Sequence, residues 1–146
     1  MENAPLGKRI VFAGKALRAR FESALSAAGA SLPTFLVLTS AREWPGVSQS
    51  ELAERVGVEG PTLVRHLDRM CAEGLVTRVR DENDRRVTHI ELTDEGIARQ
   101  AELARVAAGL DRQLRRLFTP EDLAVLDRVL IRLSDYTEET NACQPG

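Results

Sequence analysis

The sequence predicts a mainly α protein with a small β wing, a winged helix-turn-helix with further helices at both ends. Two short amphipathic segments, Gln49–Val56 and Glu59–Glu73, lie on either side of a turn at Gly57. Two strand-like runs follow, Leu75–Arg80 and Val87–Leu92, and a charged loop joins them. Elements in this order are typical of proteins that place one helix in the major groove of DNA and a loop in a neighbouring groove.

Helical periodicity also precedes this motif. Apolar residues recur at three- and four-residue steps from about Gly7 to Ala28, which predicts one long helix. Gly29 is expected to end that helix. Pro33 suits the first turn of a second helix. The run Trp44-Pro45-Gly46 is expected to end it, because proline disfavours helical geometry in the residue before it.

The two helices of the motif carry their own boundary signals. Ser48 is a candidate N-cap, and Glu51 stands three residues later as the reciprocal partner of a capping box. Pro61 is tolerated in the first turn of the second helix. Apolar and polar residues alternate along both strands, which predicts that one face of the hairpin is covered. The inward stripe predicted for the second helix consists of Leu63, Leu67 and Met70.

Two more helices are predicted after the hairpin. Thr93-Asp94-Glu95 starts a long helix, because acidic residues favour a helix amino end. Thr119-Pro120 supplies the cap and first turn of the last helix. The apolar face expected on the long helix comprises Ile97, Ala101, Ala104, Ala108 and Leu110. A near-heptad stripe on the last helix, suited to pairing with another helix, comprises Leu123, Leu126, Leu130 and Leu133.

Length and composition favour one domain with a packed core. The chain has 146 residues and is 43% hydrophobic. No apolar run approaches ~20 residues, the length that a membrane span needs. The amino-terminal sequence lacks the apolar region of a signal peptide. We therefore expect a cytoplasmic protein with no membrane partner.

The sequence indicates neither catalysis nor metal binding. Its two histidines, His66 and His89, are far apart and lack matched ligands, and His89 is expected at a strand surface. Hydrolase and phosphate-loop motifs are missing from the sequence, so we expect no enzyme activity and no cofactor. Cys71 lies on the core side of its helix, which favours an inert thiol over a redox sensor, and Cys143 lies in the tail.

The charge distribution leaves two functions open. The net charge is −2, and acids slightly outnumber arginines between Ser48 and Thr93. A DNA footprint would therefore be a local arrangement of arginines and not a field over the whole domain. The acidic balance also fits an alternative, a winged-helix module that binds another protein without reading DNA directly.

Four short motifs lie in a distinctive order along the chain: Gly60-Pro61-Thr62-Leu63-Val64-Arg65, Glu73-Gly74-Leu75-Val76, Asp84-Arg85-Arg86, and Leu92-Thr93 with Gly96. In these motifs and over nearly its whole length, the chain resembles the MarR family of transcriptional regulators, and its SlyA-like branch most closely. The resemblance implies a homodimer in which the terminal helices interlock. It also implies a repressor or activator that often releases DNA when a phenolic or other small ligand binds.

The resemblance further implies a domain organisation and an operator. A single domain would span 1–146, with a winged-helix DNA-binding lobe over 31–93 and a helical dimerisation region formed by 1–30 and 94–140. A symmetric dimer would bind an inverted-repeat site in double-stranded DNA, with the second motif helix in the major groove and the wing in the minor groove.

Ten residues are candidates for contacting that DNA. Arg65 is the first choice for base readout, because a guanidinium can donate two hydrogen bonds to a guanine edge. Arg86 is the favoured minor-groove residue, and the family resemblance implies that Asp84 braces it. For Arg69, a contact with DNA and a solvated charge on the helix surface are equally good interpretations. The complete set is Ser48 and Gln49 at a helix amino end, Pro61, Thr62, Arg65, His66 and Arg69 on the second motif helix, and Asp84, Arg85 and Arg86 in the wing.

Two of these assignments and the effector site have structural alternatives. Ser48 and Gln49 could contact a phosphate or could simply cap their helix. The resemblance implies a pocket for a small aromatic or phenolic effector near the first two helices, the long helix and the base of the wing. The apolar candidates also fit an ordinary core. The candidates for its lining are Arg20, Phe21, Phe35, Leu36 and Trp44.

Overall fold

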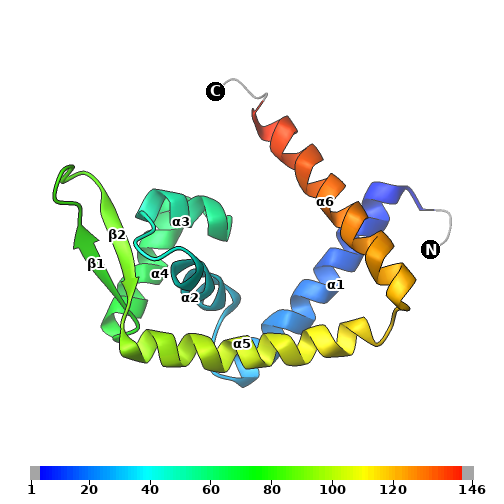
Figure 1. Ribbon diagram of the computed structural model, residues 1–146, viewed down its shortest axis with the longest axis horizontal. Coiled ribbons are helices and arrows are strands. Elements are labelled where there is room, and N and C mark those ends of the chain that lie inside the picture. Colours follow the sequence, from blue (N-terminus) through cyan, green and yellow to red (C-terminus); the bar gives the residue numbers. More distant parts are fainter. Residues whose placement is uncertain (1–3, 143–146) are drawn as a thin grey trace. The chain divides into compact units, whose positions relative to one another are not determined.

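The computed structural model describes the backbone of residues 4–142 and the side chains of residues 4–136. It confirms the mainly helical fold with a two-stranded wing (Figure 1). The chain folds as two compact units that divide between Ala108 and Gly109, within the fifth helix. In chain order the described elements are α1 (Leu6–Ala27), α2 (Leu32–Glu43), α3 (Gln49–Val56), α4 (Gly60–Ala72), β1 (Val76–Arg80), β2 (Thr88–Leu92), α5 (Asp94–Arg115) and α6 (Pro120–Ala142).

The core of the first unit draws on every helix from α1 to α5 and on both strands. The predicted inward stripe of α4 is confirmed, because its three apolar side chains are all fully buried. Burying one such side chain contributes about 1.5–3 kcal/mol, so the stripe fixes which face of α4 remains at the surface. The fully buried members of this core are Leu25, Val37, Leu38, Leu52, Leu63, Leu67, Met70, Ile90 and Leu103.

The turn between α3 and α4 is fixed at both ends of α3. The Ser48 hydroxyl accepts a hydrogen bond from the Glu51 amide at 3.3 Å, and the Glu51 carboxylate accepts one from the Ser48 amide at 3.0 Å. This is the predicted capping box. Gly57 then ends the helix with φ at 71°, a left-handed conformation that favours glycine.

The predicted apolar face of α5 is only partly covered in the single chain, where Ala104 and Leu110 are half-buried. Gly96 and Leu103 are the buried residues of this helix, whereas Ala101 and Ala108 are exposed and Ile97 is 36% exposed. The helix is therefore rotated relative to the expected stripe.

A close backbone approach explains that rotation. A Cβ atom on Gly96 would overlap the carbonyl oxygen of Leu75, so only glycine fits there. The Thr93 hydroxyl accepts a hydrogen bond from the Gly96 amide at 3.0 Å and donates to the Leu75 carbonyl at 3.1 Å. Contact between the first turn of α5 and the entry to β1 thus sets which side of α5 faces the core.

The wing is an antiparallel hairpin whose base alone reaches the core. Its register runs from Val76 opposite Leu92 to Arg80 opposite Thr88. Val76 and Ile90 lie on the same face and are buried, whereas Arg80, further along that face, is exposed, so the covered face predicted for the strands does not reach the loop. Figure 1 shows the hairpin leaving the helices towards its tip.

A third extended segment secures the base of the wing. The Ile90 amide donates a hydrogen bond to the Val47 carbonyl at 3.0 Å. Ser48 forms an isolated antiparallel bridge with His89. The extended segment before α3, Val47 and Ser48, is therefore hydrogen-bonded to β2. These bonds hold the loop between α2 and α3 against the wing.

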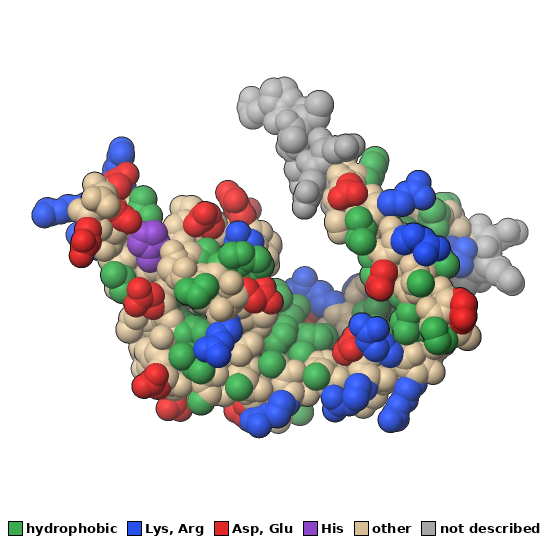
Figure 2. All heavy atoms as spheres, viewed as in Figure 1, with side chains coloured by type: hydrophobic (Ala, Val, Ile, Leu, Met, Phe, Trp, Pro, Cys, Tyr) green, Lys and Arg blue, Asp and Glu red, His purple; other side chains and the backbone are tan. Residues whose placement is uncertain are grey.

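The terminal helices expose much apolar surface. On α1, Leu25 is buried, but Leu6, Val11 and Phe12 are more than half exposed. Figure 2 shows hydrophobic side chains at the surface of α6. Of its predicted stripe, Leu130 is 51% exposed and the other three leucines are half-buried. The exposed apolar residues of α6 are Val125, Val129, Leu130, Ile131 and Tyr136.

Three further expectations concern membranes, metals and cysteines. Among the described residues no single helix has both the length and the hydropathy of a membrane span. Helices α1 and α2 have them only when taken together, and an 85° bend separates the two. The described residues also contain no group of three or more side chains suited to hold a metal. Cys71 is a free thiol packed half-buried against the core, and Cys143 lies outside the described residues.

Candidate nucleic-acid interface

The exposed face of α4 carries the predicted reading residues. Pro61, Thr62 and Arg65 are exposed, and His66 is half-buried. Within the described part of the chain, no hydrogen bond or ion pair engages the Arg65 side chain. Because the opposite face of α4 is fully buried, Arg65 is held outward with its guanidinium available to a ligand.

Arg69, one turn later, is differently placed. Its guanidinium donates a hydrogen bond to the Thr34 hydroxyl of α2 at 3.4 Å and lies 3.8 Å from the Glu73 carboxylate. These contacts direct the side chain towards α2 and the end of its own helix. Arg65 is therefore the less engaged of the two arginines, and DNA contacts by both stay predictions.

An ion pair that the sequence did not predict joins α4 to the wing. Arg78 of β1 donates to the Asp68 carboxylate at 2.6 Å and to the Val64 carbonyl at 3.3 Å. The Arg78 side chain is 30% exposed, so the pair is partly shielded from solvent. It ties the orientation of the hairpin to the helix that carries Arg65.

The wing tip contains the predicted brace between Asp84 and Arg86. The Asp84 carboxylate accepts hydrogen bonds from Arg86 Nε at 3.1 Å, from Nη2 at 3.2 Å and from the Arg86 amide at 3.0 Å. These hydrogen bonds lower the pKa of Asp84, so the carboxylate stays ionised. The Arg86 side chain nevertheless remains 91% exposed, which leaves the guanidinium oriented and accessible.

The neighbouring loop residues complete the tip. Arg85 is exposed, and Figure 2 shows basic side chains at the far end of the wing beside acidic ones. The Asp81 carboxylate accepts the amides of Asn83 and Asp84, both at 2.8 Å. Asp81 therefore folds the turn from which Asp84 and Arg86 project.

His89 lies on β2 of the same hairpin, opposite Val79 and one pair from the wing loop. Its Nε2 lies 2.9 Å from the Asp81 carboxylate, and its Nδ1 lies 2.7 Å from the Gly46 carbonyl. The expected surface strand residue is thus a bridge between the wing loop and the loop after α2. Sequence spacing could not reveal it, because Gly46 precedes His89 by 43 residues and no helical or strand period connects them.

Ser48 and Gln49 lie at the amino end of α3, as expected. Hydrogen bonds from the Ser48 hydroxyl and amide lower the pKa of the Glu51 carboxyl. The ionised carboxylate occupies the helix terminus where a phosphate would otherwise bind. The structure shows the capping role of Ser48, and phosphate contacts by Ser48 or Gln49 stay predictions.

The predicted effector residues fall into separate places. The rings of Phe21 and Phe35 are 5.4 Å apart, and both pack with Leu36 against the core. Trp44 ends α2, is 43% exposed, and has the Arg55 guanidinium 3.8 Å above its ring. Arg20 is exposed on α1.

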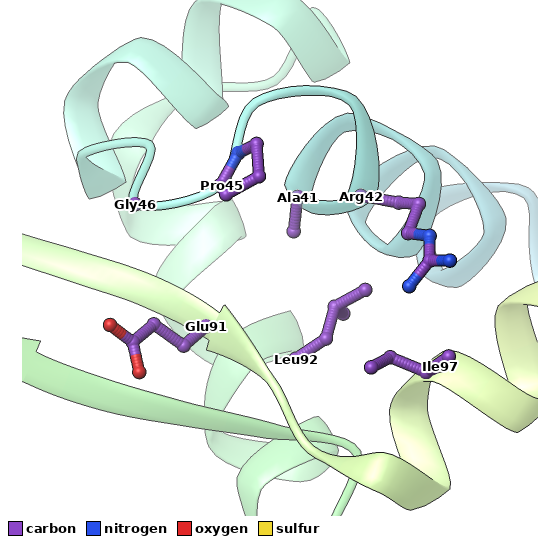
Figure 3. Close-up of a pocket in the computed structure, with 7 residues that line it drawn as sticks. All are labelled: Ala41, Arg42, Pro45, Gly46, Glu91, Leu92 and Ile97. Atoms are coloured by element: carbon purple, nitrogen blue, oxygen red, sulfur yellow. The ribbon is translucent and has the colours of Figure 1, made fainter.

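A different set of residues lines a cavity in the first unit. The cavity has a volume of about 380 Å³ and lies between the end of α2, β2 and the start of α5 (Figure 3). That volume is in the range of small-molecule sites, roughly 300–1,000 Å³. None of the five predicted effector residues lines it. Its lining consists of Ala41, Arg42, Pro45, Gly46, Glu91, Leu92 and Ile97.

Comparisons with solved structures extend over nearly the whole chain. The structure of transcriptional regulator PA3341 is 32% identical, with a TM-score of 0.81, over 92% of this chain and 99% of that one. The transcriptional repressor CouR, solved bound to a 23-mer DNA duplex, is 27% identical, with a TM-score of 0.82, over 89% and 92%. The regulator PcaV of Streptomyces coelicolor, solved with its natural ligand, is 27% identical, with a TM-score of 0.70, over 89% of each chain.

Comparison of the sequence with models of protein families also identifies a match. The MarR family model matches residues 30–88, which contain α2, α3, α4, β1, the whole wing loop and the first residue of β2. The SlyA-like branch within the family stays a prediction. The family consists of transcriptional regulators, which are not enzymes. With its winged helix, its sequence motifs and its similarity to regulators solved on DNA and with ligand, the chain belongs to the MarR family.

Proposed function

We propose that the protein is a homodimeric regulator of transcription that binds an inverted-repeat operator in double-stranded DNA. Recognition helix α4 enters the major groove and the wing enters the minor groove. One observation on α4 carries this proposal. One face of the helix is a fully buried apolar stripe, and on the other face Arg65 is exposed and has no partner among the described residues. A guanidinium held in this way can donate two parallel hydrogen bonds to guanine.

The wing supports the proposal independently. Arg86 projects from the tip with its orientation set by Asp84, which limits the entropy lost when it enters a groove. A narrow minor groove concentrates negative potential and attracts such a side chain. Arg85, exposed beside it, is suited to a backbone phosphate.

Exposed apolar side chains on α1 and on α6 support a homodimer. Large apolar side chains exposed on a helix are typical of an interaction site, because contact with water is unfavourable for them. Two copies related by a twofold axis would present two α4 helices to successive major-groove faces, about 34 Å apart along the duplex. This geometry requires half-sites in inverted orientation. A regulator that binds chromosomal DNA would act in the cytoplasm.

We also propose that a small aromatic or phenolic effector regulates DNA binding. PcaV, a similar protein, was solved with a natural ligand. In this chain the cavity between α2, β2 and α5 has a mixed lining, with the apolar Leu92 and Ile97 and the charged Arg42 and Glu91 (Figure 3). The guanidinium of Arg42 is suited to pair with an acidic group on a ligand. It touches the wing through β2, so an occupant could alter the hairpin that carries Arg86.

The structure gives little support to the alternative of a protein-binding module. That alternative rests on the acidic balance of the motif. Five of those acids are engaged within the chain: Glu51 caps α3, Asp68 pairs with Arg78, Glu73 with Arg69, Asp81 with His89, and Asp84 with Arg86. They do not form a free acidic surface for a basic partner.

Selection of bound duplexes from a random DNA pool, followed by fluorescence-anisotropy titration, tests the proposal. We expect an inverted repeat bound with a Kd of about 10⁻⁸ M or tighter, with affinity falling steeply as salt rises. Sedimentation should give a dimer. Equal affinity for the selected site and for random duplex, or a stable monomer, would overturn it.

A further inference from the structure

The hydrogen bonds of His89 with Gly46 and Asp81 depend on the protonation state of the His89 ring. The Gly46 carbonyl can only accept a hydrogen bond, and so can an ionised Asp81 carboxylate. Both ring nitrogens must therefore donate, which requires the doubly protonated imidazolium. A neutral imidazole carries one N–H and can satisfy one of these two acceptors but not both.

The charges that face His89 favour this protonated form. Asp81 faces it from the wing loop, and Glu51 faces it from the amino end of α3. Arg55, also on α3, acts on Glu51. The hydrogen bond to Asp81 raises the pKa of His89 above its usual 6.5. Burial, the next largest effect, lowers this pKa, and the Gly46 carbonyl and the charges of Asp81 and Glu51 raise it further.

The bridge connects the loop after α2 to the wing tip. One oxygen of Asp81 binds His89, and the other accepts the Asn83 and Asp84 amides. Asp84 in turn orients Arg86. A single carboxylate therefore transmits the position of the His89 ring to the turn that carries the minor-groove arginine.

We propose that His89 is a positioning residue for DNA binding: as an imidazolium it fastens the wing loop, through Asp81, to the loop after α2, through Gly46. This inference rests on the proposed function. Deprotonation at higher pH releases one proton to solvent and breaks one of the two hydrogen bonds. The turn that holds Arg86 is then less restrained, and operator affinity falls.

The first test measures the wild-type protein directly. An NMR titration of the histidine ring signals should give a His89 midpoint above 6.5, and chemical shifts typical of an imidazolium below it. In Asp81→Asn the midpoint should fall, while the asparagine oxygen can still accept the amides of residues 83 and 84. A wild-type midpoint at or below 6.5 would overturn the inference without any variant.

The second test follows operator affinity with pH. From about pH 6 to about pH 8.5 the wild-type Kd should rise by about fivefold, the order expected for losing one charge-assisted hydrogen bond through an indirect route. His89→Gln, shown to be folded by its thermal melt, should remove most of this pH dependence. A His89→Gln protein that keeps the wild-type ratio would contradict the proposal.

The other histidine supplies the matched control. His66 lies half-buried on α4, and in the described residues it makes none of the contacts that His89 makes with Asp81 and Gly46. His66→Gln should keep the wild-type ratio of Kd values, whatever it does to affinity itself. If His66→Gln abolishes the ratio, the inference fails. DNA binding without any pH response overturns this inference alone, whereas no DNA binding at any pH overturns the proposed function.

Discussion

Helix α4 and the wing are the two regions proposed to touch DNA, and they are held by different forces. Three fully buried apolar side chains anchor α4. The wing, beyond its base, is held by ion pairs and hydrogen bonds centred on Asp81, Asp84 and Arg78. Burial of apolar surface hardly responds to pH or salt, whereas exposed charge pairs respond to both. Major-groove contacts should therefore be robust, and minor-groove contacts adjustable.

The largest effect is expected for the anchor of α4. Leu67→Ala removes a side chain that is 0% exposed and should lower the free energy of unfolding by about 2–5 kcal/mol. Urea unfolding measures this change. Val64→Ala, on the same helix but at a position 37% exposed, is the control and should have a clearly smaller effect. Equal effects of the two variants would contradict the packing described here.

Next comes the loss of the α4 guanidinium. Arg65→Ala should leave stability unchanged and weaken operator binding by about 1–3 kcal/mol for each half-site. Anisotropy titration at constant salt measures the change. Arg105→Ala removes the same charge from an exposed position on α5 and should have little effect. If both variants weaken binding equally, net charge and not base readout explains the affinity.

A smaller change in operator affinity, opposite in sign to simple electrostatics, is expected for the wing. Asp84→Ala removes a negative charge near DNA, which by electrostatics alone would strengthen binding. We expect instead about threefold weaker binding, because Arg86 loses its brace. Glu82→Ala, an exposed acid of the same loop, should strengthen binding slightly. Stronger binding by Asp84→Ala would show that Asp84 does not position Arg86.

The smallest effect concerns stability in acid. The hydrogen bond from His89, followed by those from the Asp84 and Asn83 amides, lowers the pKa of Asp81 from 3.8 to about 2. Since the folded pKa lies below the unfolded value, the contribution of Asp81 is fully present above pH 3.8 and is lost as pH falls towards 2. Urea unfolding of Asp81→Asn should lack this part of the acid dependence. Glu82→Gln should retain it, and identical curves for Asp81→Asn and the wild type would refute the assignment.

The sequence allowed prediction of those features that depend on neighbouring residues. The capping box of Ser48, the inward stripe of α4, the turn at Gly57 and the pairing of Asp84 with Arg86 all involve residues within a few positions of each other. Side-chain identity and local backbone geometry decide such features. They are confirmed nearly residue by residue.

Features that depend on contacts between distant segments were missed. The rotation of α5 follows from its approach to Leu75. A glycine at position 96 permits that approach, but the sequence alone does not reveal the contact. The ion pair of Arg78 with Asp68 and the bridge from His89 to Gly46 join different elements. No period in the sequence relates their members, so only the folded chain reveals them.

The central claim is that Arg65 reads a base, and the base preferences of the bound site test it most directly. Selection from random duplexes with the wild type and with Arg65→Ala gives the preference at every position of the site. We predict that the variant loses a guanine preference at one pair of symmetry-related positions and keeps the preferences elsewhere. An unchanged set of preferences in a folded, dimeric Arg65→Ala protein would contradict the claim.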